Sequence, residues 1–336
     1  MTIIDGTFST PRHTTHYLEC GPADGPLMIF LHGWPSIGLI WHAQLEAFGA
    51  DGWHCVAPDL RGYGGSSKPA ANDAYSIEEA VVDMAELHDH LGGQGAIWVG
   101  HDWGSIVAGA VTAHEPTRSR GVVLTSWAYF PDSNSLDTLV PLVDRTIYPA
   151  AEYPDGQWDY YRYYTTHFEE AVDDLDADHA ATLASIYRPG NPDAAGKASP
   201  TAVVTRNGGR FGSAHRAPPT PSDPALWPPA DFEVLVDAFT SHGFRSPCAW
   251  YTNDEANTAY ARKAPDGGRL SQPVLFVNGE WDAICSITGN RQGDPMRAAC
   301  ADLTITRLAG GHWLPVERKN ELIDEMRYWL RSKNLR

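Results

Sequence analysis

Short apolar runs alternate with amphipathic segments over roughly the first 130 residues of the chain. The runs lie at 27–31, 54–57, 96–99 and 121–125. Nearly continuous apolar runs of this length are typical of strands in a parallel sheet that is covered on both faces. Between them, residues 76–91 have helical spacing and begin with Ser76-Ile77-Glu78-Glu79, which resembles a capping box. The pattern therefore predicts consecutive βαβ units.

The pattern changes near Pro131. Residues 134–265 lose the strand alternation and become aromatic, acidic and helical, with one helical segment expected over 157–176. Strand-like runs return at 273–277 and 303–306, and an amphipathic helix is expected over about 318–333. We therefore expect an α/β core formed by 1–133 and 266–336, into which a helical domain of residues 134–265 is inserted.

A proline-rich passage covers residues 217–229 within this helical region. As a low-complexity linker it would be disordered. Leu226 and Trp227 are embedded in it, and large apolar side chains of this kind favour a docked, ordered loop.

The segment from Val99 to Ser105 places Gly-His-Asp-Trp-Gly between a predicted strand and the helix-like run 106–111. Small residues on both sides of a central nucleophile are required where a strand turns sharply into a helix. Asp102 is the central residue, and a carboxylate there attacks carbon to form an alkyl ester, which suits epoxides and haloalkanes. The alternative is that Asp102 only caps the following helix. We expect His101 to be structural.

Two further polar residues follow later strands. Asp282 comes after the run 273–277, and His312 lies in a glycine-rich turn after 303–306. The order nucleophile, acid, histidine predicts a triad of Asp102, Asp282 and His312, with the imidazole neutral near pH 7 so that it can activate water. Asp132 is the alternative acid.

His32-Gly33-Trp34-Pro35 directly follows the first apolar run. A loop there brings a backbone N–H over the nucleophile, so the amides of Trp34 and Trp103 are the expected oxyanion hole.

Four segments carry a family resemblance: HGWP at 32–35, Asp59-Leu60-Arg61-Gly62-Tyr63-Gly64-Gly65-Ser66-Ser67-Lys68-Pro69, GHDWGS at 100–105 and GGHW at 310–313. Together they resemble the epoxide hydrolase branch of the α/β-hydrolase family. The resemblance implies a mostly parallel central sheet flanked by helices, with residues 134–265 as an inserted helical cap. It also implies hydrolysis of an epoxide to a vicinal diol through a covalent ester on Asp102, without cofactor or metal.

The resemblance further implies two cap tyrosines that polarise the epoxide oxygen. Tyr251 lies in a segment similar to the family's Asn-Trp-Tyr-Arg, although Ala249 and Thr252 replace the Asn and the Arg. Its partner is sought within 158–170, where Tyr164 fits best and Tyr160 and Tyr161 are alternatives. The expected pocket residues are His32, Pro35, Trp158, Tyr160, Trp250 and Trp281.

Other functions stay open at this point. A hydrolytic dehalogenase with the same triad would bind halide through indole or amide N–H groups and would need no tyrosine pair. A non-catalytic ligand-binding protein of the same fold is a further alternative. A serine esterase is disfavoured because the chain contains no G-x-S-x-G.

Charge and composition exclude several classes of binding partner. The net charge of −17 disfavours nucleic acid and anionic membranes. The N-terminal residues have no basic region followed by an apolar run, so we expect no signal peptide. No run approaches the roughly 18 apolar residues that a membrane span requires. The five cysteines are scattered along the chain, which suggests reduced thiols in a cytoplasmic protein. The 14 histidines show no metal-binding spacing. Because 36 residues are aromatic (12 Trp, 14 Tyr and 10 Phe), we expect a bulky or aromatic small-molecule epoxide. The sequence leaves open whether the chain forms a homodimer.

Overall fold

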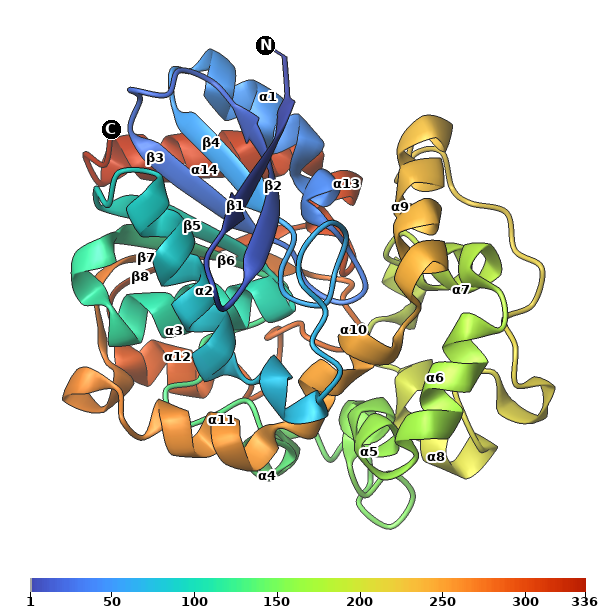
Figure 1. The fold of residues 1–336 in the computed structure, drawn as a ribbon. Coiled ribbons are helices and arrows are strands. Elements are labelled where there is room, and N and C mark those ends of the chain that lie inside the picture. Colours follow the sequence, from blue (N-terminus) through green and yellow to red (C-terminus); the bar gives the residue numbers. More distant parts are fainter. Residues whose placement is uncertain (1) are drawn as a thin grey trace.

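The computed structural model describes residues 2–336 (Figure 1). Met1, the first residue of the terminal run that argues against a signal peptide, lies outside the described residues. Within them, eight strands form one sheet in the order β1-β2-β4-β3-β5-β6-β7-β8. No helix in residues 2–336 has the length and apolar character that crossing a membrane requires.

The six strands predicted from apolar runs are confirmed. They are β3 (Leu27–Leu31), β4 (His54–Pro58), β5 (Ala96–His101), β6 (Ser119–Thr125), β7 (Leu270–Gly279) and β8 (Cys300–Leu308). All neighbouring pairs among them are parallel. Their carboxyl ends therefore meet at one edge of the sheet, which is where the loops with polar side chains begin.

Two strands were not predicted, β1 (Ile4–Ser9) and β2 (Thr14–Cys20), which pair antiparallel at one end of the sheet. Strand β1 is an edge strand with largely exposed side chains, so its sequence has no apolar run to mark it. The sheet is therefore mostly parallel, as expected, with an antiparallel extension.

Helices cover both faces of the sheet. In Figure 1, α2 (Ile77–His90) and α3 (Trp103–His114) lie in front of it, and α1 (His42–Ala50) and α14 (Lys319–Ser332) lie behind it. Helix α12 (Asp294–Ala299) precedes β8. The predicted helices at 76–91 and 318–333 thus correspond to α2 and α14. Ser76 caps α2 by accepting a hydrogen bond from the N–H of Glu79, as the capping-box pattern predicted.

The chain between β6 and β7 is helical, and we call it the helical segment. Its α-helices are α4 (Leu136–Leu139), α5 (Asp159–Thr166), α6 (Phe168–Asp176), α7 (His179–Ile186), α8 (Val204–Asn207), α9 (Pro229–His242), α10 (Arg245–Ala249) and α11 (Asp254–Ala261). The single helix expected over 157–176 is wrong, because the backbone leaves the helical region at His167 and separates α5 from α6. In Figure 1, α5 to α9 gather beside the sheet, whereas α11 lies with the core helices.

The proline-rich passage is docked, which confirms the favoured prediction. Trp227 is only 2% exposed and Leu226 is buried as well. Together they line a groove with Leu39, Ile40 and Pro315 of the core, so the passage holds the helical segment against the core. The five cysteines are buried and free, in agreement with reduced thiols.

Candidate active site

Asp102 lies at the turn between β5 and α3, where the backbone is strained. Its φ of 53° is in the left-handed region, which non-glycine residues rarely adopt. Neighbouring backbone passes very close: a Cβ on Gly104 would lie 2.1 Å from the carbonyl oxygen of Leu31, and one on Gly100 would lie 2.4 Å from that of Gly104. The two glycines are therefore required for the turn, which presents the Asp102 carboxylate at the carboxyl edge of the sheet.

The loop after β3 supplies a hydrogen-bond donor to this carboxylate. The backbone N–H of Trp34 donates to Oδ1 of Asp102 at 2.8 Å. A Cβ on Gly33 would lie 2.4 Å from the same oxygen, so only glycine allows this approach. Trp103 begins α3, and the first N–H groups of a helix have no partner within the helix. The two amides expected to form an anion hole thus flank Asp102.

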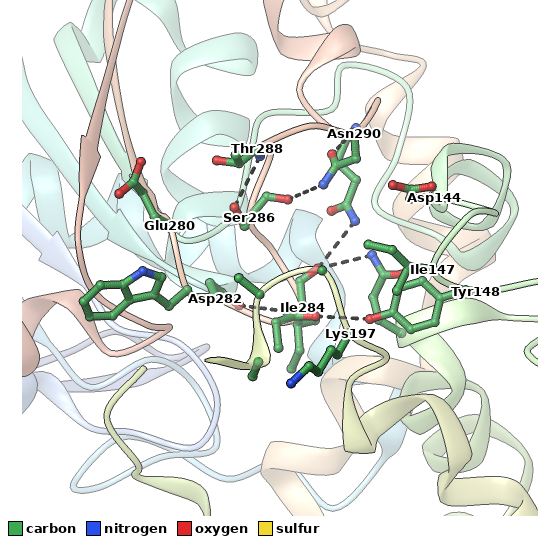
Figure 2. Close-up of a pocket in the computed structure, with 17 residues that line it drawn as sticks. Asp144, Ile147, Tyr148, Lys197, Glu280, Asp282, Ile284, Ser286, Thr288 and Asn290 are labelled. Atoms are coloured by element: carbon green, nitrogen blue, oxygen red, sulfur yellow. Dashed lines mark hydrogen bonds between the residues drawn. The ribbon is translucent and has the colours of Figure 1, made fainter. Parts of the chain in front are cut away.

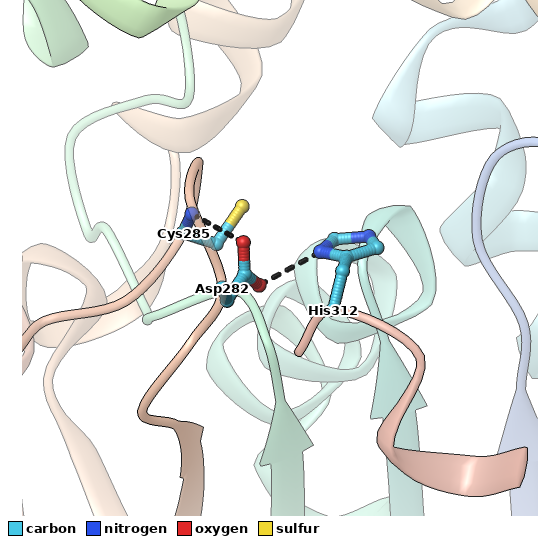
Figure 3. A group of neighbouring side chains, drawn as sticks. All are labelled: Asp282, Cys285 and His312. Atoms are coloured by element: carbon cyan, nitrogen blue, oxygen red, sulfur yellow. Dashed lines mark hydrogen bonds and ion pairs between the residues drawn. The ribbon is translucent and has the colours of Figure 1, made fainter. Parts of the chain in front are cut away.

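His312 and Asp282 come together from the loops after β8 and β7 (Figure 3). Nδ1 of His312 lies 2.8 Å from Oδ2 of Asp282, and its Nε2 lies 3.6 Å from Oδ2 of Asp102. The other oxygen of Asp282 accepts the N–H groups of Ile284 and Cys285. The acid that bonds to the histidine is therefore Asp282 and not Asp132.

His312 and Asp282 shift each other's pKa values. Burial lowers the pKa of His312, but the carboxylates of Asp282 and Asp102 outweigh it and raise the pKa well above the ordinary value. Burial raises the pKa of Asp282, yet the charge and hydrogen bond of His312 hold it below the ordinary value. The direction of this shift runs against the expectation of a neutral imidazole near pH 7 in the free protein, because two anionic neighbours favour the imidazolium.

Asp282, Cys285 and His312 also bring three potential metal-ligand atoms within 4.8 Å of one another. In Figure 3, Asp282 is held by the N–H of Cys285 and by His312, and the N–H of Ile284 also donates to it. Burial raises the pKa of the Cys285 thiol. A protonated thiol is a poor ligand. These residues fit a hydrogen-bonded catalytic set better than a metal site.

The side chains of His101 and His32 form hydrogen bonds with backbone groups and do not line the cavity. Nε2–H of His101 donates to the carbonyl oxygen of His312 at 2.8 Å, and burial lowers the pKa of His101 to about 4. Nε2 of His32 accepts the N–H of Leu60 at 2.9 Å. The expectation for His101 is confirmed, whereas His32 lies behind the cavity wall.

The run from Asp59 to Pro69 is likewise structural. The Asp59 carboxylate accepts the N–H groups of Gly38 and Gly65, and Arg61 pairs with Asp83 at 2.6 Å. These contacts fix the loops beneath the helical segment and contribute no side chain to the cavity.

A cavity of about 410 Å³ opens above Asp102, between the core and the helical segment. Its walls include Asp102, Asp282 and His312, together with Trp34, Tyr160, Ile186, Arg188, Arg210, Tyr251, Trp281, Ile284 and Trp313. Of the expected pocket residues, Tyr160 and Trp281 line it. Trp158, Trp250 and Pro35 do not: Trp158 packs on Trp127, Trp250 donates to the carbonyl oxygen of Arg61, and Pro35 accepts from Tyr187.

The tyrosines of α5 have different surroundings. Tyr160 lines the cavity, and its ring centroid lies 5.8 Å from that of Tyr251. Tyr164 is absent from the cavity wall and packs behind it against Trp34 and Tyr251. The Tyr161 hydroxyl donates to Asp254. Contrary to the placement expected for Tyr164, Tyr160 is therefore the tyrosine of α5 that lines the cavity together with Tyr251.

The sequence carried a signal for this residue. A tyrosine followed three and four residues later by two aromatics fits Tyr160, with Tyr163 and Tyr164 behind it. Tyr164 has the same spacing one helical turn later, with His167 and Phe168 behind it, so spacing alone does not separate the two tyrosines. In contrast, Arg188, Arg210 and Trp313 were missed as cavity residues, and no periodicity or spacing marks them.

A smaller cavity of about 140 Å³ lies on the other side of the Asp282 loop (Figure 2). Both cavities share Trp281 and Ile284. Here Gln157 of the helical segment and Gln292 of the core donate side-chain N–H groups to the carbonyl oxygen of Ile284. The acid loop is thus held from both sides.

The comparisons agree with this geometry. The alpha/beta hydrolase fold family matches residues 26–319. Epoxide hydrolase A of Mycobacterium tuberculosis (strain ATCC 25618 / H37Rv) is 28% identical over 95% of this chain and 94% of its own length. Epoxide hydrolase A from Mycobacterium thermoresistibile has a similar structure, with a TM-score of 0.79, 27% identity and 98% of both chains covered. An epoxide hydrolase from an endophytic Streptomyces has a TM-score of 0.78 and 26% identity, covering 98% of this chain and 95% of its own.

Proposed function

Since this chain belongs to the α/β-hydrolase family, we propose that it is an epoxide hydrolase that opens small epoxides to vicinal diols. The observation that carries the proposal is the pairing of Asp102 at the turn after β5 with two phenols, Tyr160 and Tyr251, on the walls of the same cavity. The similarity to epoxide hydrolases over nearly the whole chain supports it. We further propose that residues 134–265 act as the cap over this cavity.

In the first step, the Asp102 carboxylate attacks an epoxide carbon, and the C–O bond of the ring breaks. The electron pair goes to the epoxide oxygen, which needs a proton or a hydrogen bond because an alkoxide is a poor leaving group. Burial, followed by charges that include that of Asp102, raises the pKa values of Tyr160 and Tyr251 well above the ordinary value. Both phenols therefore stay protonated and serve as donors to the opening oxygen.

In the second step, His312 removes a proton from water as the water oxygen attacks the ester carbonyl of Asp102. Asp282 orients the imidazole and stabilises its charged form. The N–H of Trp34, which already contacts Oδ1 of Asp102, and the N–H of Trp103 stabilise the tetrahedral oxyanion. Collapse of this intermediate breaks the ester C–O bond and restores the Asp102 carboxylate. The remaining hydroxyl proton of the intermediate and the proton held by His312 pass to the departing oxygen and to the phenol that protonated the epoxide oxygen, so the diol leaves neutral and one water is consumed in each turnover.

A hydrolytic dehalogenase is the second candidate, and one observation favours it. Within residues 2–336, the buried indole N–H groups of Trp34 and Trp103 have no hydrogen-bond partner, and a departing halide would use such donors. A halide leaves without a proton, however, so it gives no role to two cavity tyrosines. The epoxide proposal accounts for more of the site.

The test is product formation, followed by mass spectrometry, from a mixed panel of aryl and alkyl epoxides, haloalkanes and haloacids. We expect diol from epoxides with the native protein and none with Asp102→Ala. His312→Gln should lower turnover by about 100- to 10,000-fold and let an alkylated protein accumulate, seen as a mass increase equal to one epoxide. Alcohol from halides without diol would shift the assignment to dehalogenase, and normal turnover by His312→Gln would refute the mechanism.

A further inference from the structure

Arg210 places a positive charge in the cavity that the reaction steps do not use. It follows α8 in the helical segment and lines the same cavity as Asp102 and Tyr251. Its guanidinium carbon lies 5.8 Å from the ring centroid of Trp34, the residue whose backbone N–H contacts Asp102. Stacking of this kind holds a guanidinium in place, and Arg210 also lies beside the Tyr164 hydroxyl, so the remaining N–H groups of the guanidinium can bind a ligand.

No protein carboxylate neutralises this charge. Within residues 2–336, Arg210 forms no ion pair, whereas Arg216, further along the same segment, pairs with Asp178 at 2.8 Å. Arg188, the other arginine of the cavity wall, donates to the carbonyl oxygen of Pro221 and also has no carboxylate partner in the described chain. The chain carries 42 acidic and 25 basic residues, so basic side chains are in the minority. Two guanidinium groups without a carboxylate partner on the walls of one cavity are therefore a local feature of this site.

We propose that the cavity takes epoxides that carry a carboxylate, and that Arg210 binds this carboxylate at a distance from the reacting carbon. The inference rests on the proposed function, which it deepens by naming the substrate class. The other walls are formed largely by aromatic and aliphatic side chains such as Trp34, Ile186 and Trp281, so the substrate has an apolar body between its epoxide and its anionic end. A guanidinium fork matches a carboxylate in a bidentate geometry.

A carboxylate fits better than a phosphate for an electrostatic reason. Asp102 and Asp282 already place negative charge on the walls of the same cavity, and only His312 lies between them. A dianionic group would meet more repulsion from these carboxylates than a single carboxylate does. An epoxide with a phosphate in place of the carboxylate is therefore the poorer substrate.

The experiment compares an aryl epoxide that bears a carboxylate with its primary amide, which has nearly the same shape, and with its phosphate analogue. We expect the native protein to favour the carboxylate over the amide by about tenfold or more in kcat/KM, mainly through KM. Arg210→Gln should bring the ratio of kcat/KM for the carboxylate over the amide down to about one, and Arg210→Lys should retain part of the preference. Arg216→Gln is the matched control, because it removes the same charge from an exposed arginine of the helical segment, and it should leave the preference intact.

A binding experiment without an epoxide tests this inference separately from the proposed function. Calorimetry with phenylbutanoate and phenylbutanamide, which carry no epoxide, should show tighter binding of the anion to the native protein and loss of the difference in Arg210→Gln. If both epoxides react equally well, or if Arg210→Gln keeps the preference, the anion site is refuted and epoxide hydrolysis stands. If no epoxide reacts but the anion still binds through Arg210, the proposed function fails and the anion site stands.

Discussion

Two buried tyrosines one helical turn apart differ in what their hydroxyls can reach. Tyr160 lines the cavity with Asp102, and Tyr164 packs behind it. We expect Tyr160→Phe to slow formation of the alkylated protein by about 10- to 100-fold, because the opening oxygen loses one donor, and to leave ester hydrolysis largely unchanged. Rapid-quench mass spectrometry measures the two steps separately.

Tyr164→Phe is the matched control for this change. The Tyr164 hydroxyl is buried behind the cavity wall, and its charged neighbour Arg210 is also held by stacking on Trp34, so loss of the hydroxyl leaves Arg210 in place. Alkylation by Tyr164→Phe should stay within about twofold of native. A larger loss in Tyr164→Phe than in Tyr160→Phe would restore the assignment that the sequence favoured.

The raised pKa of His312 lets us predict how the rate of ester hydrolysis changes with pH. Two carboxylates raise the pKa of His312 in the free protein, and ester formation on Asp102 removes the charge of one of them. The pKa of His312 should therefore be lower in the alkylated protein than in the free protein. Because the neutral imidazole is the base, hydrolysis of the ester should speed up as pH rises through this lower pKa and then level off.

Single-turnover hydrolysis over a range of pH gives the pKa of His312 in the alkylated protein, and NMR titration of the imidazole gives it in the free protein. Equal midpoints would contradict the electrostatic role of Asp102. A hydrolysis rate that falls as pH rises would contradict the role of His312 as a base.

At the scale of elements, the site depends on how closely α3 approaches β3. A Cβ on Gly104 would lie 2.1 Å from the carbonyl oxygen of Leu31, and backbone cannot move away as a flexible side chain can. Gly104→Ala should lower the free energy of unfolding by about 2 kcal/mol or more and abolish most turnover, because α3 must shift and carry Asp102 with it. Urea denaturation and diol formation measure the two effects.

Ala110→Gly on the same helix is the control for Gly104→Ala. It weakens α3 by helix propensity alone, about 1 kcal/mol, without any steric conflict. Turnover at saturating substrate should stay near native. Equal losses of activity in the two variants would show that helix stability, and not the approach to β3, sets the position of Asp102.

At the scale of the whole molecule, Trp227 is one of the buried side chains through which the helical segment contacts the core. Trp227 is buried against Tyr187 and lies in a groove with residues of the core. Trp227→Ala should lower the free energy of unfolding by about 3 to 5 kcal/mol and expose residues 217–229 to proteolysis, because a large apolar contact is lost. Trp227→Phe should retain part of the stability. Unchanged cleavage kinetics in Trp227→Ala would show that the passage is held elsewhere.

The sequence by itself determined the parts of this protein that depend on local pattern. Continuous apolar runs marked the parallel strands because burial on both faces leaves no polar position in them. Glycines around Asp102 marked the turn, since no other residue fits there, and chain order brought Asp282 and His312 to the same edge of the sheet. The first two signals lie within a few consecutive residues, and the third depends only on each polar residue following its own strand.

Only the tertiary structure decided what depends on contacts between distant segments. Strand β1 gains its order from pairing with β2 and not from an apolar run of its own. The choice of Tyr160 over Tyr164 depends on which face of α5 meets Asp102, and the charge of His312 depends on carboxylates 210 and 30 residues away in the chain. Arg210 reaches the cavity because the helical segment folds back over the core. Such relations are set by packing and by electrostatics across space, which no local pattern encodes.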